Sequence, residues 1–205
     1  MSKKNNSGRK KPDKILIGGL CAIGAALLLI GGGILLLFSG NEEETMTPGS
    51  FAAVGEEDSA TACQNLMSSY YTAIMSEDGE SLYKLMAPPE YWDYYMEEYS
   101  KDEADIISTY NDAASNTVAS WHAQCGDDAK VSFKIEASGY QTDEFLTEWS
   151  DTMNEALGEE VLKAEEAMTL SVKQTVTGST DTVETVTSPT LIKVNGKWYI
   201  LDEGV

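Results

Sequence analysis

The chain has 205 residues and a formal net charge of −20 at pH 7, from 14 Lys and Arg against 34 Asp and Glu. Six of the basic residues and one acidic residue lie within residues 1–14, which leaves 8 basic against 33 acidic residues, a net charge of −25, in the rest. Such a surface repels phosphates, so charge-driven binding to nucleic acid or to anionic lipid is excluded as a function, whereas cations and basic partners stay open.

Residues 15–38 carry no charged side chain. A helix of this length is about 36 Å long and the hydrocarbon core of a bilayer is about 30 Å thick, so we expect it to span the membrane. Basic residues precede the segment and Glu42, Glu43 and Glu44 follow it. The positive-inside rule then predicts a single-pass cell-membrane protein with a cytoplasmic basic tail at 1–14, a transmembrane helix at 15–38 and its C-terminal part outside the cytoplasm.

Two other interpretations of this apolar segment are a cleaved signal peptide and a lipoprotein signal. Its length exceeds the apolar core of a signal peptide, and the nearest cleavage site would place the bulky Phe38 at position −3. Leu20 precedes Cys21, where a lipoprotein signal has a small residue. The segment therefore favours an uncleaved anchor. Its glycines lack a repeated spacing that would argue for dimerisation of the helix.

Residues 39–59 are rich in Gly, Ser and Glu and are predicted to form an acidic flexible linker before a domain at 60–205. Four helices are expected next, at 59–75, 80–86, 90–96 and 102–124. The first has an apolar stripe at helical spacing: Cys63, Leu66, Met67, Tyr70, Tyr71 and Ile74.

After Gly126 the apolar period changes from 3.6 to 2, which predicts a strand over 131–137. A helix is expected over 142–157, and strands over 168–176, within 182–194 and over 198–201. Asn195-Gly196 is typical of a two-residue hairpin turn. Helices first and antiparallel strands after, with one helix inserted, predict an α+β fold.

Cys63 and Cys125 are the two cysteines beyond the apolar segment. In a domain outside the cytoplasm such a pair favours a disulfide, with two buried thiols as the alternative. A disulfide would place the start of the first helix beside the end of the fourth.

Three stretches resemble the nuclear transport factor 2-like family: the first helix with its exit at Asp78, Leu85-Met-Ala-Pro88, and the closing hairpin 191–201. The resemblance covers about residues 60–203. It implies a cone of helices packed on a curved antiparallel sheet, as in ketosteroid isomerase and small envelope proteins, here of a Gram-positive bacterium. Because these stretches are structural, they support a fold more than a function.

No catalytic constellation of that family can be matched, and no metal ligands or cofactor motif were found, so no catalytic, metal or cofactor residue is predicted. His122 is a lone histidine with an expected structural role, and Asp78 is expected to cap a helix. An aromatic cluster, Tyr91, Trp92, Tyr94, Tyr95 and Tyr99, is typical of either core packing or a ligand pocket. The candidate ligand-binding residues are Trp92, Tyr94 and Tyr95.

The leading hypothesis is a membrane-tethered, non-enzymatic domain that binds an envelope protein or a small apolar ligand. The alternatives are a ketosteroid-isomerase-like or dehydratase-like enzyme, which requires an ionisable group buried in the cone, and a structural envelope protein acting as a homodimer. Nothing in the sequence argues directly for an enzyme.

Overall fold

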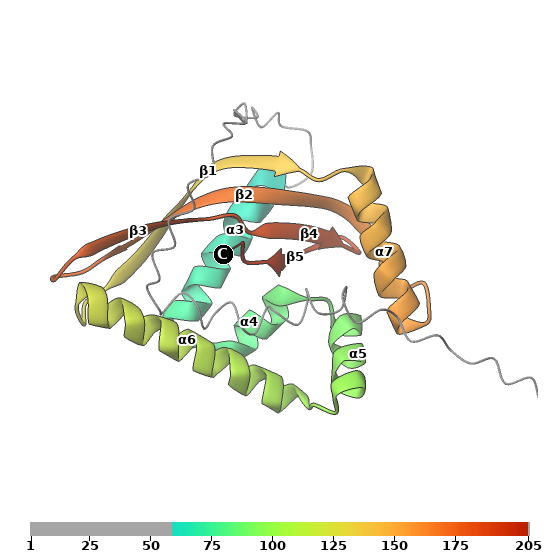
Figure 1. Ribbon diagram of the computed structural model, residues 1–205, viewed down its shortest axis with the longest axis horizontal. Helices are drawn as coiled ribbons and strands as arrows, with labels where there is room; N and C mark the ends of the chain where they lie inside the picture. Colours follow the sequence, from blue (N-terminus) through green and yellow to red (C-terminus); the bar gives the residue numbers. More distant parts are fainter. Residues whose placement is uncertain (1–58, 205) are drawn as a thin grey trace, which may run out of the picture.

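The computed structural model describes residues 59–204, which form an α+β domain of five helices and an antiparallel sheet (Figure 1). The helices are α3 (Ser59–Met75), α4 (Gly79–Met86), α5 (Pro89–Tyr99), α6 (Glu103–Cys125) and α7 (Asp143–Leu157). The strands are β1 (Lys130–Tyr140), β2 (Ala164–Thr177), β3 (Thr182–Thr187), β4 (Thr190–Val194) and β5 (Lys197–Asp202).

The predicted fold class needs a correction, because it joined this domain to a transmembrane helix. Within residues 59–204, no helix is both long enough and apolar enough to cross a bilayer. The expected tail at 1–14, the apolar segment at 15–38 and nearly all of the linker at 39–59 lie outside the described residues. The localisation inferred from them stays a prediction.

The helices begin and end where local chemistry satisfies their free backbone groups. Asp78, Asp102 and Thr142 cap α4, α6 and α7, each accepting a hydrogen bond from a backbone N–H in the first turn. At the other ends, Ser100 and Gly158 adopt the left-handed conformation that closes α5 and α7. All five predicted helices are thereby confirmed. Helix α5 is longer than expected, since it starts at Pro89 and continues to Tyr99, where Ser100 caps it.

The sheet is organised around the long strand β2. Strand β1 pairs with one edge of β2, and β4 and β3 pair with successive parts of the other edge, while β5 pairs with β4. Asn195 and Gly196 have φ values of 50° and 81°, which confirms the predicted hairpin turn between β4 and β5. The expected run over 182–194 is divided into β3 and β4 at Ser188-Pro189.

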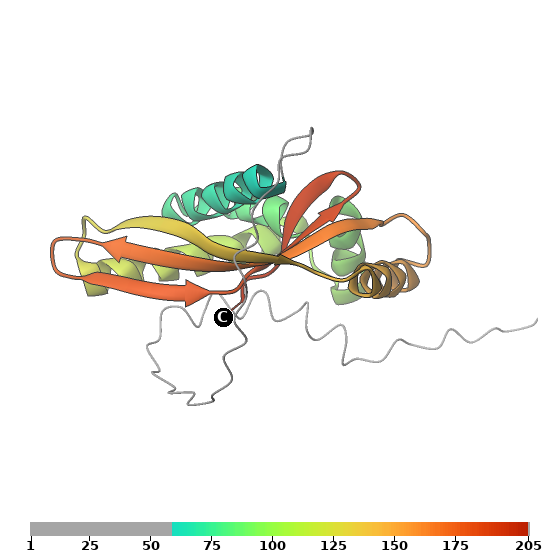
Figure 2. The same ribbon diagram turned by 90° about the horizontal axis from the view of Figure 1, so that it is seen from above.

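Helices and sheet form layers around one core. Figure 2 shows α3 running along one side of the strands and α7 seen end-on at one end of the sheet. Helix α6 packs on α3 and α4 and reaches β2 and β3. One face of β2 contributes Met168, Leu170, Val172 and Val176 to the core, all nearly inaccessible to solvent. The packing of α3 and α6 against this face leaves a small cavity between them.

Cys63 and Cys125 are both buried and are not joined to each other, so the predicted disulfide is wrong. The Cys63 sulfur lies 3.8 Å from the Met168 sulfur, and the Cys125 sulfur lies 3.6 Å from the Val176 carbonyl oxygen. Eight residues of β2 separate these two contacts, about 26 Å of extended strand. A disulfide needs Cα atoms within about 7 Å of each other, so Cys63 on α3 and Cys125 at the end of α6 are too far apart to form one.

Candidate functional site

The aromatic cluster of α5 is part of the core. The Trp92 side chain is 6% exposed, and its indole N–H donates a hydrogen bond to the Tyr83 carbonyl oxygen over 3.0 Å. Its ring stacks on Tyr83 at 4.8 Å and meets Tyr91, Tyr95 and Tyr110 edge-on. These contacts fix α5 to α4 and α6.

Tyr94 and Tyr95 are half-buried on the same helix, and Tyr95 continues the ring contacts to Tyr99 at 4.7 Å. Neither of the two cavities described below is lined by Trp92, Tyr94 or Tyr95. A ligand-binding role for these three residues stays a prediction, whereas the packing role of Trp92 is visible directly.

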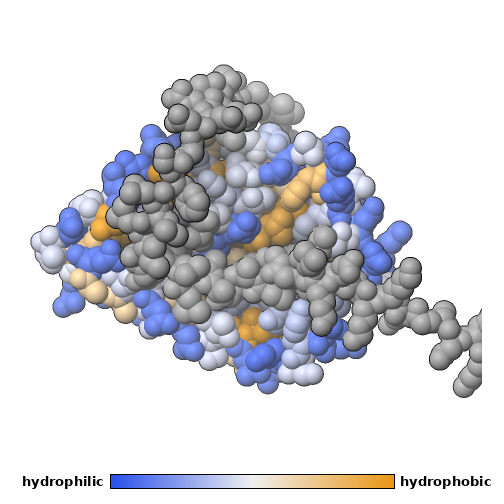
Figure 3. Space-filling model, in the orientation of Figure 1, coloured by the Kyte–Doolittle hydropathy of each residue, from blue (hydrophilic) through white to orange (hydrophobic). Residues whose placement is uncertain are grey.

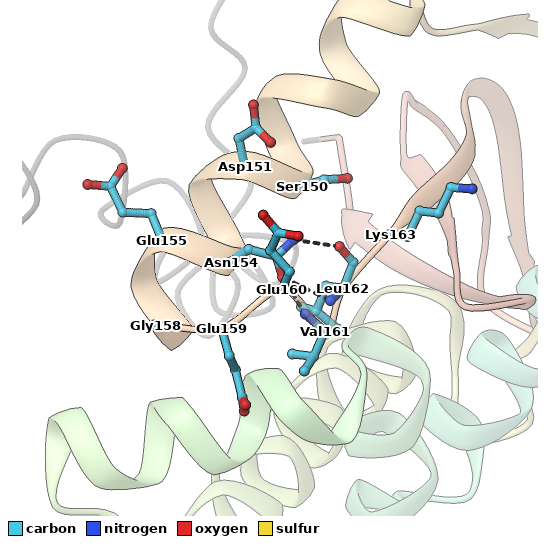
Figure 4. Close-up of a pocket in the computed structure, with 10 residues that line it drawn as sticks. All are labelled: Ser150, Asp151, Asn154, Glu155, Gly158, Glu159, Glu160, Val161, Leu162 and Lys163. Atoms are coloured by element: carbon cyan, nitrogen blue, oxygen red, sulfur yellow. Dashed lines mark hydrogen bonds between the residues drawn. The ribbon is translucent and has the colours of Figure 1, made fainter.

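An open groove of about 790 Å³ lies between the end of α7 and the segment that leads into β2 (Figure 4). Asn154 forms its floor by accepting hydrogen bonds from the backbone N–H groups of Val161 and Leu162 and donating one to the Leu162 carbonyl oxygen. Four carboxylates line the groove: Asp151, Glu155, Glu159 and Glu160.

These carboxylates do not converge on a point. Figure 4 shows Asp151, Glu155 and Glu159 directed away from one another and out of the groove. The right-hand rim of the molecule in Figure 3, where Figure 1 places α7, is correspondingly hydrophilic. In the described part of the chain, no group of three or more His, Cys, Asp or Glu side chains could hold a metal ion. The groove is therefore a solvated acidic surface.

A second, more enclosed cavity of about 20 Å³ lies in the centre of the domain, where α3, α6 and the sheet meet. It is lined by Met67, Tyr70, Tyr71, Ile74, Thr117, Trp121, Gln174, Thr187, Pro189, Ile200 and Glu203. A volume of this size holds about one water molecule. The walls are aromatic and aliphatic except for a few polar groups, and only one of these, Glu203, is a carboxylic acid.

Glu203 is 6% exposed, and neither of its carboxyl oxygens has a hydrogen-bond partner. Among residues 59–204, the only other buried side-chain polar atom without a partner is the indole nitrogen of Trp149. Buried polar groups are almost always hydrogen-bonded, because leaving one unpaired costs about 1–3 kcal/mol. An unpaired carboxyl in a cavity wall therefore needs an explanation.

The turn after β5 directs Glu203 inward. Strand pairing ends at Asp202, whose carboxylate accepts a hydrogen bond from the Gly204 N–H over 2.9 Å. The Gly204 carbonyl oxygen in turn accepts one from the Ser188 N–H over 2.9 Å. Gly204 has a φ of 63°, which favours glycine. These contacts bend the chain across Ser188-Pro189 and place the carboxyl in the cavity.

Burial raises the pKa of Glu203 from 4.5 to about 7, and the nearby charge of Asp202 acts in the same direction. The Tyr70 hydroxyl opposes the rise and holds the pKa lower than burial alone would. The Tyr70 hydroxyl thus favours the ionised form, although it does not meet the distance and angle of a well-formed hydrogen bond to either carboxyl oxygen. Near neutral pH, Glu203 exists in both protonated and ionised forms.

Three tyrosines surround this carboxyl. Burial and then the Glu203 charge raise the pKa of Tyr70 and of Tyr110 well above the ordinary value. Burial raises the pKa of Tyr71 to about 12, although a hydrogen bond with Thr187 opposes it. All three hydroxyls are therefore protonated at neutral pH and can act as hydrogen-bond donors. Together with Glu203 they give the cavity one proton-exchanging group and several neutral donors.

The other polar residues singled out in the sequence have local roles. Asp78 caps α4 as expected, accepting hydrogen bonds from the Ser81 N–H and hydroxyl at 3.0 and 2.6 Å. His122 lies in the last turn of α6, where its carbonyl oxygen accepts a hydrogen bond from Gly126, and it does not line the central cavity. Neither residue is near Glu203 in the cavity wall.

The sequence gives no sign that Glu203 is a functional residue. The closing Asp202-Glu203-Gly204 has the composition of a solvent-exposed acidic end, and no pattern in it marks the middle residue as buried. Only the turn around Gly204 distinguishes Glu203 from the exposed Asp202 before it.

No protein-family model, no curated protein and no solved structure matches the chain. The fold shown here is an α+β domain, and membership of the nuclear transport factor 2-like family stays a prediction.

Proposed function

We propose that residues 59–204 form a binding domain for a small, largely apolar molecule, and that the polar group of this molecule is recognised by Glu203. The observation that supports the proposal is the unpaired, buried carboxyl in the wall of the central cavity. Ligand sites in proteins are mostly apolar cavities with a few placed polar groups, often with perturbed pKa values.

The chemistry of the walls defines the ligand class. Met67, Ile74 and Ile200 offer apolar contact, and Trp121 offers an aromatic face. A protonated Glu203 can donate to a carbonyl oxygen of the ligand and can also accept from a hydroxyl group. Because the cavity has room for one water-sized group, the ligand inserts its carbonyl or hydroxyl first. Phenols and cyclic ketones fit this description, provided that part of the wall moves to admit the ring.

Phenol and cyclohexanone are suitable probes for a titration of the full chain, followed by NMR of the backbone amides. We expect saturable shifts at Ile200 and neighbouring residues, and loss of these shifts in Glu203→Leu, which removes the polar group but keeps an apolar side chain of similar size. The matched control is Glu136→Leu, an exposed carboxylate on β1. Binding of neither probe by the wild-type chain, or equal binding by Glu203→Leu, contradicts the proposal.

An acid–base enzyme is the second candidate, and the same carboxyl favours it. A general acid or base works best when its pKa is near the working pH, and Glu203 has a pKa of about 7. The test is exchange of the α-hydrogens of cyclohexanone in D₂O. An enzyme accelerates this exchange and loses the acceleration in Glu203→Gln, whereas a binding domain leaves the rate at that of buffer.

A further inference from the structure

The turn Asp202–Gly204 contributes Glu203 to the wall of the central cavity. Glu203 itself lines the cavity, and two hydrogen bonds hold the turn, from Ser188 to the Gly204 carbonyl oxygen and from Gly204 to the Asp202 carboxylate. Asp202 is the last residue paired in the sheet, opposite Thr190. Glu203 and Gly204 can therefore move without breaking any strand pairing.

The turn fits closely against the connection between β3 and β4. A Cβ atom added to Gly204 would lie 2.0 Å from the carbonyl carbon and oxygen of Ser188. Thr187 and Pro189, on either side of Ser188, line the same cavity. The Ser188–Gly204 hydrogen bond thus joins two segments that both form the cavity wall.

The groups around Glu203 compensate an ionised carboxylate only in part, because the Tyr70 hydroxyl favours the ionised form but burial outweighs it. The titratable groups acting on it or facing it are Tyr70 and Tyr71 from α3, Tyr110 from α6 and Asp202 from the end of β5. The tyrosines are neutral and Asp202 is negative, and no basic side chain of the described residues is among them. An ionised Glu203 therefore gains hydration, and escapes the repulsion of Asp202, by leaving the cavity.

We propose that the turn Asp202–Gly204 is a proton-controlled gate of the central cavity: protonated Glu203 keeps it closed, and ionised Glu203 moves into water, breaks the Ser188–Gly204 hydrogen bond and opens the cavity. The opening provides the movement that a ring-sized ligand requires. The proposed function explains what the gate is for, but the movement of the gate needs no ligand.

Amide hydrogen exchange on the full chain tests the gate directly. The Ser188 N–H is bonded to Gly204, whereas the Leu170 N–H is bonded to the neighbouring Pro189 carbonyl oxygen and reports on the sheet. After correction for intrinsic exchange, we expect opening at Ser188 to increase on the order of 50-fold between about pH 5 and pH 8, as linkage to the two carboxyl states requires. The opening measured at the Leu170 amide should increase much less over the same pH range.

The matched variants are Glu203→Gln, which cannot ionise, and Glu136→Gln on the exposed face of β1. Glu203→Gln should lose the pH dependence at Ser188, and Glu136→Gln should keep it. Unchanged opening in the wild-type chain, or the same pH dependence in Glu203→Gln, overturns the gate. Because no ligand is present, this outcome is separate from failure of phenol or cyclohexanone to bind.

Discussion

Tyr70 and Glu203 alter each other's ionisation across the central cavity: the carboxylate raises the pKa of Tyr70, and Tyr70 keeps the pKa of Glu203 below the value that burial alone would give. The pair joins the first helix of the domain to the residue that follows its last strand. Because burial outweighs the effect of Tyr70, the folded state binds a proton at Glu203 more tightly than the unfolded chain does, which has a measurable effect on stability.

The free energy of unfolding should fall as the pH rises from about 4.5 to about 7, because the pKa of Glu203 is higher in the folded state than its ordinary value. The stability that protonation provides is present in full below pH 4.5 and lost as the pH passes through the folded pKa. The difference between the folded pKa of about 7 and the ordinary value of 4.5 corresponds to about 3 kcal/mol of stability. Urea unfolding of the wild-type chain and of Glu203→Gln at both ends of this range measures it. An identical pH dependence in the two chains contradicts the assignment.

Because Cys63 and Cys125 do not form a disulfide, a reductant should not change the stability of the domain. Since Cys63 and Cys125 contact different ends of β2, dithiothreitol should not change the urea midpoint. A disulfide closing a loop of this length would contribute about 3–4 kcal/mol, so its reduction would lower the midpoint clearly. Thiol labelling of the unfolded, unreduced chain gives the same answer, with both cysteines expected to react.

Replacement of Trp92 by Ala should lower the free energy of unfolding by about 3–5 kcal/mol, because it removes a buried ring and the hydrogen bond to Tyr83. Tyr140→Ala is the matched control on a side chain that is 65% exposed, and it should change stability by less than about 0.5 kcal/mol. Chemical denaturation of both variants measures these changes in the free energy of unfolding. A small effect of Trp92→Ala would mean that the cluster is not core packing.

Gly204→Ala should open the turn at every pH. The new Cβ would collide with the Ser188 carbonyl group, and the backbone there has a φ of 63°. Exchange of the Ser188 amide should be fast and independent of pH in this variant. Gly139→Ala on β1 is the control, because nothing lies within 4 Å of its added Cβ. Retention of slow exchange at Ser188 in Gly204→Ala would show that the turn is not held by this fit.

The elements of this domain follow from local patterns in the sequence. The 3.6-residue stripe from Cys63 to Ile74 defines α3, and the alternation from Val131 defines β1. Asn195-Gly196 fixes the last hairpin because only a few residues tolerate positive φ.

Contacts between residues that are far apart in the chain could not be predicted from local patterns. The presence of Cys63 and Cys125 suggests a pair, but only the arrangement of α3 and α6 on β2 shows that they face opposite ends of that strand. Glu203 follows Asp202 in an acidic run, and its burial depends on a turn fixed by Ser188, fifteen residues earlier. Such placements arise from tertiary packing and leave no periodicity in the sequence.

The pKa of Glu203 can be measured directly. ¹³C NMR titration of the side-chain carboxyl in the full chain, assigned by comparison with Glu203→Gln, reports this value without reference to any ligand. The buried, unpaired carboxyl described here predicts a midpoint of about 7. A midpoint at the ordinary value of 4.5 would show that Glu203 is solvated, and both the ligand site and its gate would then be wrong.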